Sequence, residues 1–124
     1  MILAIVDDLM FTSKIRTAAS QLGVAVTFAR SRDAALTGMR DATPSLVILD
    51  LNAGRTDPLG VVASMKADSA LAGIPTVGFV SHVQTDLIER ARQAGVGEVM
   101  ARSAFTARLA DILTNAQPSR IPNS

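Results

Sequence analysis

The sequence predicts an α/β protein with three layers, in which helices cover both faces of a doubly wound sheet of five parallel strands. Two observations lead to this prediction. Short apolar runs recur five times along the 124 residues, and most lack the alternation of a sheet with one face in water. Segments with helical apolar spacing follow each run. Five successive βα units are typical of a parallel (βα)5 sheet, for which we expect the strand order 2-1-3-4-5.

The five expected strands are continuous apolar runs, the last of which is the weakest. They are residues 2–6, 24–28, 46–49, 76–80 and 97–101. Residues with strong capping preferences stand at the expected helix ends. These are Ser31, Asp57 followed by Pro58, and Ser103 at helix starts, and Gly23 and Gly95 at helix ends. The methionines, Met10 among them, fall in or beside the apolar stripes, and we expect them in the core.

Composition excludes several classes of protein. Apolar residues make up 48% and charged residues 19% of the chain, which predicts a folded globular domain. The 12 basic and 11 acidic residues nearly balance, and Trp and Tyr are absent, so we expect no nucleic-acid partner. The chain has no Cys and one His, which excludes thiolate and histidine-rich metal sites.

Domain organisation and location follow from the same patterns. The apolar runs are too short for a signal peptide or a membrane span, so we expect a cytoplasmic protein with no membrane contact. One domain is expected over residues 1–116. Residues 117–124 contain two prolines and no apolar stripe, which indicates a C-terminal tail or the start of a linker.

Candidate site residues follow four of the five expected strands. Asp7 and Asp8 follow the first, Asp50 the third, Ser81 the fourth and Arg102 the fifth. Ligands of open parallel sheets bind beyond the carboxyl ends of the strands, and neighbouring strands 1 and 3 make the three aspartates converge. Such an all-oxygen set suits Mg²⁺. A carboxylate held there can attack phosphorus to form an acyl phosphate, with Ser81 and Arg102 binding the phosphoryl oxygens.

Four segments together indicate a family. They are Ile-Val-Asp7-Asp8, Leu-Val-Ile-Leu-Asp50-Leu-Asn52, Ile-Pro-Thr-Val-Gly-Phe-Val-Ser81 and Ala94-Gly95-Val-Gly-Glu-Val-Met-Ala-Arg102. With these segments, residues 1–116 resemble the receiver domain of two-component response regulators, which has a flavodoxin-like fold. The resemblance implies a signal transduction domain of a phosphorelay that switches conformation, so we expect no enzyme that releases a product.

The resemblance also assigns roles to residues. It implies that Asp50 accepts a phosphoryl group from a sensor histidine kinase or a phosphotransfer protein, in a Mg²⁺-dependent reaction. Asp8, Asp50 and the backbone carbonyl of Asn52 would hold Mg²⁺, with Asp7 assisting through water. Ser81 would move toward the phosphoryl group on activation. A downstream effector protein or domain would bind the face formed by the fourth helix, fifth strand and fifth helix.

Several positions depart from the family pattern. Arg102 stands where the family has lysine, and the two are not interchangeable. Val99 replaces an aromatic switch residue, Ser103 replaces a proline, and His82 follows Ser81 where a small residue is usual. These departures leave a second interpretation open, a pseudo-receiver that binds proteins without being phosphorylated.

Simpler or different roles also stay open. Asp8 can serve only as the N-cap of the first helix, and Ser81 as the N-cap of the fourth. A third interpretation is a flavodoxin-like cofactor binder or a hydrolase. Thr12 lies near the end of the first strand, although Asp7 and Asp8 would repel a flavin phosphate.

Overall fold

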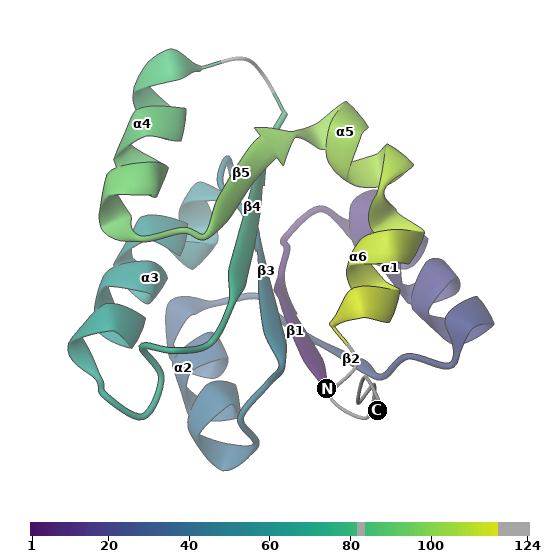
Figure 1. Cartoon of the computed structure of the whole chain (residues 1–124), viewed down its shortest axis with the longest axis horizontal. Helices are drawn as coiled ribbons and strands as arrows, with labels where there is room; N and C mark the ends of the chain where they lie inside the picture. The colour runs from purple at the N-terminus through teal and green to yellow at the C-terminus, as the bar shows by residue number, and fades with distance from the viewer. Residues whose placement is uncertain (82–83, 117–124) are drawn as a thin grey trace.

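The sheet has the predicted topology. The computed structural model describes residues 1–81 and 84–116, in which five parallel strands lie in the order β2-β1-β3-β4-β5 (Figure 1). The strands are β1 (Ile2–Ile5), β2 (Val26–Ala29), β3 (Leu46–Asp50), β4 (Thr76–Val80) and β5 (Glu98–Ala101). The inner strands β1, β3 and β4 are buried along their whole length, which explains why they read as continuous apolar runs. The predicted fold class is therefore confirmed.

Helices cover both faces of the sheet. The helical segments are α1 (Leu9–Leu22), α2 (Arg32–Asp41), the 3-10 turn η1 (Gly54–Thr56), α3 (Pro58–Ala67), α4 (Thr85–Ala94), α5 (Arg102–Ala107) and α6 (Leu109–Asn115). Figure 1 shows α1, α5 and α6 on one side of the sheet and α2, α3 and α4 on the other. None of the helices within residues 1–81 and 84–116 is long and apolar enough to cross a membrane.

Most of the predicted helix ends are confirmed. Gly23 and Gly95 end α1 and α4 with left-handed φ angles of 70° and 109°, which glycine adopts without steric cost. Ser31 accepts a hydrogen bond from the amide of Ala34, and Asp57 precedes Pro58 at the start of α3. His82, which departs from the family pattern, and residues 117–124, which we expected to form a tail or a linker start, lie outside the described residues.

The prediction for the fifth helix was wrong. Ser103 caps nothing, because the chain passes directly from β5 into α5 and Ala101 is the N-cap. The helix is also divided in two at Arg108, whose amide donates to the carbonyls of both Ala104 and Phe105. The Arg108 side chain returns to Glu98 on β5 at 2.8 Å.

The core consists of one apolar cluster on each face of the sheet. Alternate residues of β1 divide between them, with Ile2 and Ala4 facing α1 and Leu3 and Ile5 facing α2 and α3. Met39 and Met65 are buried as predicted. Met10 is not: it is 83% exposed, because the second residue of α1 faces away from the sheet.

Three phenylalanines pack together on the α1 face. Phe79 of β4 contacts Phe11 of α1 and Phe105 of α5, in both cases with ring centroids 4.8 Å apart. Centroid distances of this size are typical of favourable aromatic pairs. The cluster therefore connects the start of α1 and of α5 to β4, the strand that pairs with the end of β3 where Asp50 lies.

Candidate acidic site at the carboxyl edge of the sheet

The pairing of β1 with β3 places the three aspartates at one edge. Ile5 pairs with Leu49, so Val6 lies beside Asp50, and Asp7 and Asp8 follow at the same edge. Asp50 closes β3 and pairs with Phe79 of β4 on its other side. Sequence reasoning predicted this convergence from the strand order alone.

Asp50 is the buried member of the group. The residue is 6% exposed, and its Oδ1 accepts a hydrogen bond from the amide of Asn52 at 3.0 Å. Its other oxygen has no hydrogen-bond partner within the described ranges. Burial raises the pKa of the Asp50 carboxyl, and the charges of Asp8 and Asp7 raise it further, whereas the Asn52 amide and the Arg102 charge lower it. The charged form of Asp50 is therefore poorly solvated and available for bonding.

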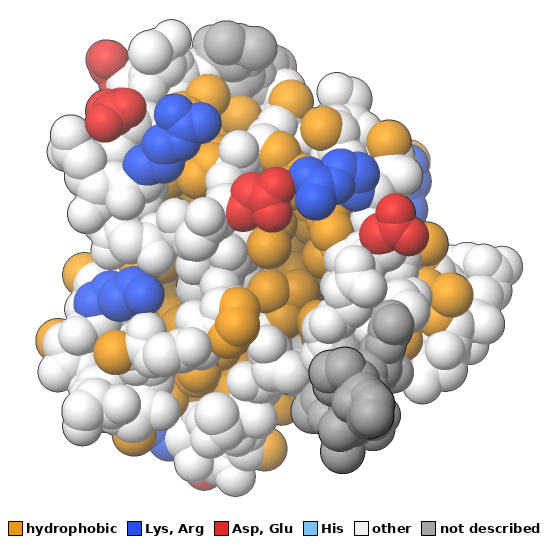
Figure 2. Space-filling model, in the orientation of Figure 1, with side chains coloured by type: hydrophobic (Ala, Val, Ile, Leu, Met, Phe, Trp, Pro, Cys, Tyr) orange, Lys and Arg blue, Asp and Glu red, His pale blue; other side chains and the backbone are white. Residues whose placement is uncertain are grey.

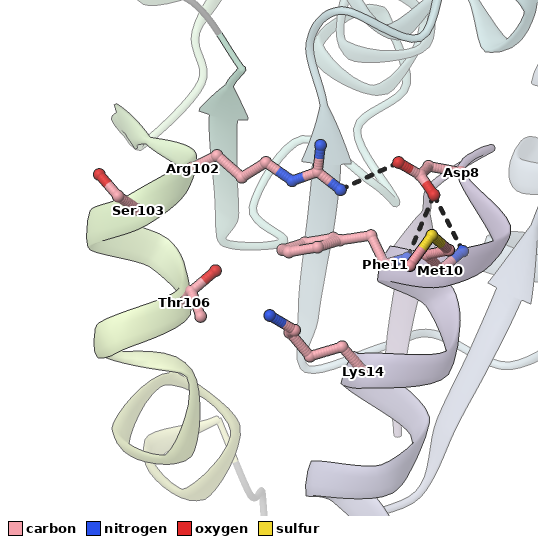
Figure 3. A pocket seen from close by; sticks show the side chains of 7 residues that line it. All are labelled: Asp8, Met10, Phe11, Lys14, Arg102, Ser103 and Thr106. Atoms are coloured by element: carbon pink, nitrogen blue, oxygen red, sulfur yellow. Dashed lines mark hydrogen bonds and ion pairs between the residues drawn. The ribbon is translucent and has the colours of Figure 1, made fainter.

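Both oxygens of Asp8 are engaged. As the N-cap of α1, its Oδ1 accepts from the amides of Met10 and Phe11, at 2.9 and 3.2 Å. Its Oδ2 accepts from Nη2 of Arg102 at 3.0 Å (Figure 3). The hydrogen bond from Arg102 is the largest cause that lowers the pKa of Asp8, and the Phe11 amide adds to it. The predicted capping role is confirmed, and the pairing with Arg102 comes in addition to it.

Arg102 reaches across the edge from the start of α5. Figure 3 shows its side chain extended toward Asp8 with the guanidinium beside Phe11. The guanidinium carbon lies 4.2 Å from the centroid of the Phe11 ring, a favourable cation–π distance. Sequence reasoning placed Arg102 at this edge but expected it to meet a phosphoryl group. It did not foresee that the ring of Phe11 supports the cation.

Asp7 meets two arginines that sequence reasoning missed. Its carboxylate lies 3.9 Å from Nε of Arg30 and 3.7 Å from Nε of Arg55. Arg30 follows β2 at the same edge as the aspartates, which was the signal that could have identified it. Arg55 belongs to η1, in a loop whose path no local pattern predicts.

Asn52 and Ser81 are joined to each other. Oδ1 of Asn52 accepts from the amide of Ser81, and Nδ2 of Asn52 donates to Oε1 of Gln84, both at 2.6 Å. The alternative of Ser81 as a helix cap is wrong, because Gln84 holds the N-cap position of α4. The Ser81 residue is exposed. Asn52 therefore ties the loop after β3 to the loop after β4.

The expected magnesium set does not form a metal centre in this arrangement. Among the described residues, no group of three or more His, Asp or Glu side chains is placed to hold a metal ion. The oxygens are of the type that Mg²⁺ prefers, but arginines pair with Asp7 and Asp8 and leave only Asp50 without a cation of its own. The residues present do not fit the metal while Arg102 bonds Asp8.

A surface cavity of about 550 Å³ adjoins the Asp8–Arg102 pair. Figure 3 shows it between α1 and α5. Its lining residues are Asp8, Met10, Phe11, Lys14, Arg102, Ser103 and Thr106. Leu9 and Met10 beside it are 66% and 83% exposed.

Comparison with known proteins identifies the fold. No protein-family model and no curated protein matches the sequence, but many solved structures match it. The phosphorylated cyanobacterial phytochrome response regulator RcpA is 24% identical, with a TM-score of 0.77 over 92% of this chain and 88% of its own. The receiver domain of NtrX from Brucella abortus is 22% identical, with a TM-score of 0.80 over 96% and 99%. The Mn²⁺-bound response regulator Rcp1 is 17% identical, with a TM-score of 0.80 over 99% and 98%.

These similar structures are response regulators and a receiver domain. The resemblance read from the sequence is thus confirmed as a likeness of structure, with the (βα)5 fold and strand order shared over nearly the whole chain.

Proposed function

We propose that this chain is a receiver domain of two-component signalling in which Asp50 accepts a phosphoryl group from a phosphohistidine of a partner protein. One observation carries the proposal. Asp50 is a buried carboxylate at the end of the central strand, with one oxygen held by the Asn52 amide and the other without a partner among the described residues. The likeness to RcpA, a response regulator solved in its phosphorylated form, supports phosphorylation of this chain.

The proposed step is a displacement at phosphorus. The Asp50 oxygen that has no hydrogen-bond partner among the described residues attacks the phosphorus, a P–O bond forms, and the P–N bond of the phosphohistidine breaks. The leaving imidazole nitrogen keeps the electron pair and takes a proton, and Asp50 becomes an acyl phosphate. Water later attacks that phosphorus and releases inorganic phosphate. The output is a shift between two conformations, so we propose a signalling domain and not an enzyme.

The residues around Asp50 contribute position and charge. The Asn52 amide orients the carboxylate, and the positive charge of Arg102 favours the ionised form of Asp50 that attacks. Ser81, whose amide is held by Asn52, is proposed as the hydroxyl donor to a phosphoryl oxygen. The likeness to Rcp1 in its Mn²⁺-bound form supports a role for a divalent cation in this chain as well. Mg²⁺ is the cofactor that the resemblance implies. Asp8 and Asp50 would hold it only once Arg102 has left Asp8, and it would then neutralise phosphoryl oxygens.

The partners follow from the same proposal. The phosphodonor is a sensor histidine kinase or a phosphotransfer protein in the cytoplasm. The effector surface is the face of α4, β5 and α5. Figure 2 shows acidic and basic side chains interspersed with hydrophobic ones over the visible face of the molecule.

The test is intact mass after incubation with a small phosphodonor such as phosphoramidate. We expect one added phosphoryl group on the wild type and none on Asp50→Asn. Asp41→Asn is the matched control, because it makes the same change at the exposed last residue of α2, at the end of the helix that leads to the start of β3, and it should be labelled fully. Hydroxylamine should remove the group, as expected of an acyl phosphate. Equal labelling of Asp50→Asn and wild type would refute the assignment.

A second candidate function is the pseudo-receiver, a protein-binding module without phosphorylation. The observation that favours it is the complete pairing of Asp7 and Asp8 with arginines, which leaves the edge neutralised without a ligand. Absence of labelling by both phosphoramidate and a phosphohistidine-containing partner protein would favour this candidate over phosphoryl transfer.

A further inference from the structure

We propose that Arg102 is a built-in cation that competes with divalent metal ions for Asp8, so that the acidic edge binds metal strongly only when Arg102 has left. The inference deepens the proposed function, because it concerns regulation of the same site. According to this inference, the position of one side chain, Arg102, determines how strongly the edge binds a divalent metal ion. It predicts weak metal binding by the resting protein.

The first argument is the occupancy of the Asp8 oxygens. Oδ2 bonds Arg102 at 3.0 Å, and Oδ1 caps α1 through the amides of Met10 and Phe11. A metal ion that takes Oδ2 must displace the guanidinium. One that takes Oδ1 must break the helix cap. Either route adds a cost that an unpaired aspartate would not have.

The second argument is that the aromatic ring of Phe11 holds the Arg102 guanidinium in place. Its guanidinium lies over the ring of Phe11 at 4.2 Å, and Phe11 packs against Phe79 and Phe105. Phe11 also donates its amide to Asp8. One residue therefore orients both partners of the ion pair, which reduces the entropy that Arg102 loses on pairing. The side chains of Arg102 and Asp8 are 32% and 41% exposed, so water and salt screen part of their attraction.

The third argument is the balance of charge. Asp7 already has Arg30 and Arg55 within 4 Å. With Arg102 on Asp8, three arginines face three aspartates at this edge. A divalent cation added to the resting edge would bring excess positive charge next to guanidinium groups, and repulsion between them weakens its binding.

The test uses Mn²⁺ as the probe, at constant ionic strength, with the broadening of backbone amide NMR signals near Asp8 and Asp50 as the readout. Arg102→Gln removes the charge and keeps much of the stem, and Arg102→Ala is a second variant should the first misfold. Arg108→Gln is the matched control. Arg108 also forms an exposed ion pair, with Glu98 at 2.8 Å, so its loss changes the net charge equally.

We expect Arg102→Gln to bind Mn²⁺ about two- to threefold more tightly than the wild type, the size expected when a partly exposed ion pair no longer competes. Arg108→Gln should bind like the wild type. The double variant Arg102→Gln with Asp8→Asn should lose the gain, and Asn at position 8 keeps the helix cap. Excess Mg²⁺ should displace Mn²⁺ from Arg102→Gln, as both are hard cations with oxygen ligands.

Equal Mn²⁺ affinity of wild type and Arg102→Gln would overturn the inference, as would an equal gain in Arg108→Gln. The experiment does not depend on phosphoryl transfer. If Asp50 is never phosphorylated but Arg102→Gln gains metal affinity, the proposed function fails and the competition stands. If Asp50 is phosphorylated and the Mn²⁺ affinities of wild type and Arg102→Gln are equal, the proposed function stands and the competition fails.

Discussion

Substitutions at Asp8 separate its two structural roles. Asp8→Ala removes the N-cap of α1 and the ion pair with Arg102, whereas Asp8→Asn removes only the ion pair, since asparagine caps helices as well as aspartate. The cap, with its two amide hydrogen bonds, contributes about 1 kcal/mol to the free energy of unfolding. The partly exposed pair contributes about 0.5 kcal/mol. We therefore expect losses of about 1.5 kcal/mol for Asp8→Ala and about 0.5 kcal/mol for Asp8→Asn.

The assay is urea unfolding followed by far-UV circular dichroism, because the chain lacks Trp and Tyr for fluorescence. A double-mutant cycle of Asp8→Asn with Arg102→Gln isolates the pair. Arg102 lowers the pKa of Asp8 in the folded protein below its ordinary value of 3.8. The contribution of the pair is therefore fully present above pH 3.8 and is lost as the pH falls through the lower, folded pKa.

Two results would refute this reasoning. If Asp8→Asn destabilises the protein as much as Asp8→Ala, the hydrogen bonds to Met10 and Phe11 do not cap α1 in the way described. If the effects of Asp8→Asn and Arg102→Gln on the free energy of unfolding are additive, Arg102 and Asp8 do not stabilise each other. The second result would also remove the basis for competition between Arg102 and a metal ion.

Two further predictions concern stability. Burial raises the folded pKa of Asp50 above its ordinary value of 3.8. The contribution of the protonated carboxyl to the free energy of unfolding is therefore present below pH 3.8 and is lost as the pH rises through the folded pKa. Asp50→Asn should then be more stable than the wild type at neutral pH, and the gain should vanish in acid; urea midpoints at several pH values test this, and a gain independent of pH would contradict it. Gly78→Ala should lower the free energy of unfolding by about 1–3 kcal/mol, because the added Cβ would lie 2.8 Å from Cδ1 of Leu51. Gly38→Ala is its control: nothing lies within 4 Å of the added atom in α2, so it should raise stability by about 0.5–1 kcal/mol, and equal effects of both changes would contradict the packing argument.

Much of the fold could be predicted because its signals are local. The three inner strands are buried on both faces, so their residues are apolar almost without interruption and their bounds were found within one residue. The second strand was placed two residues too early. Val24 is apolar for another reason: it is buried just beyond the end of α1, where its amide donates to the carbonyl of Ala19. A hydrophobic residue after a C-capping glycine belongs to the helix end, and its pattern imitates the start of a strand.

The site could be predicted less completely, because its charge pairs span long distances in sequence. Strand order alone brings Asp7, Asp8 and Asp50 to one edge. The partner of each carboxylate depends on how far an arginine side chain reaches, and Arg102 lies 94 positions from Asp8. Arg55 reaches Asp7 from a short 3-10 turn that apolar periodicity does not predict. Periodicity carries no information about such pairs.

The pairing of Arg102 links the proposed chemistry to a change of structure. A phosphoryl group on Asp50 would bring about 1.5 to 2 negative charges to the edge, and Arg102 already acts on the Asp50 carboxyl electrostatically. The guanidinium would then have two anionic neighbours in place of one. Movement toward Asp50 would give up the bond to Asp8 and the contact with the Phe11 ring, which together join the start of α5 to the start of α1. Val99 stands where the resemblance to receiver domains implies an aromatic switch residue. The Arg102–Phe11 contact would offer another route by which the proposed phosphorylation alters the surface at α5.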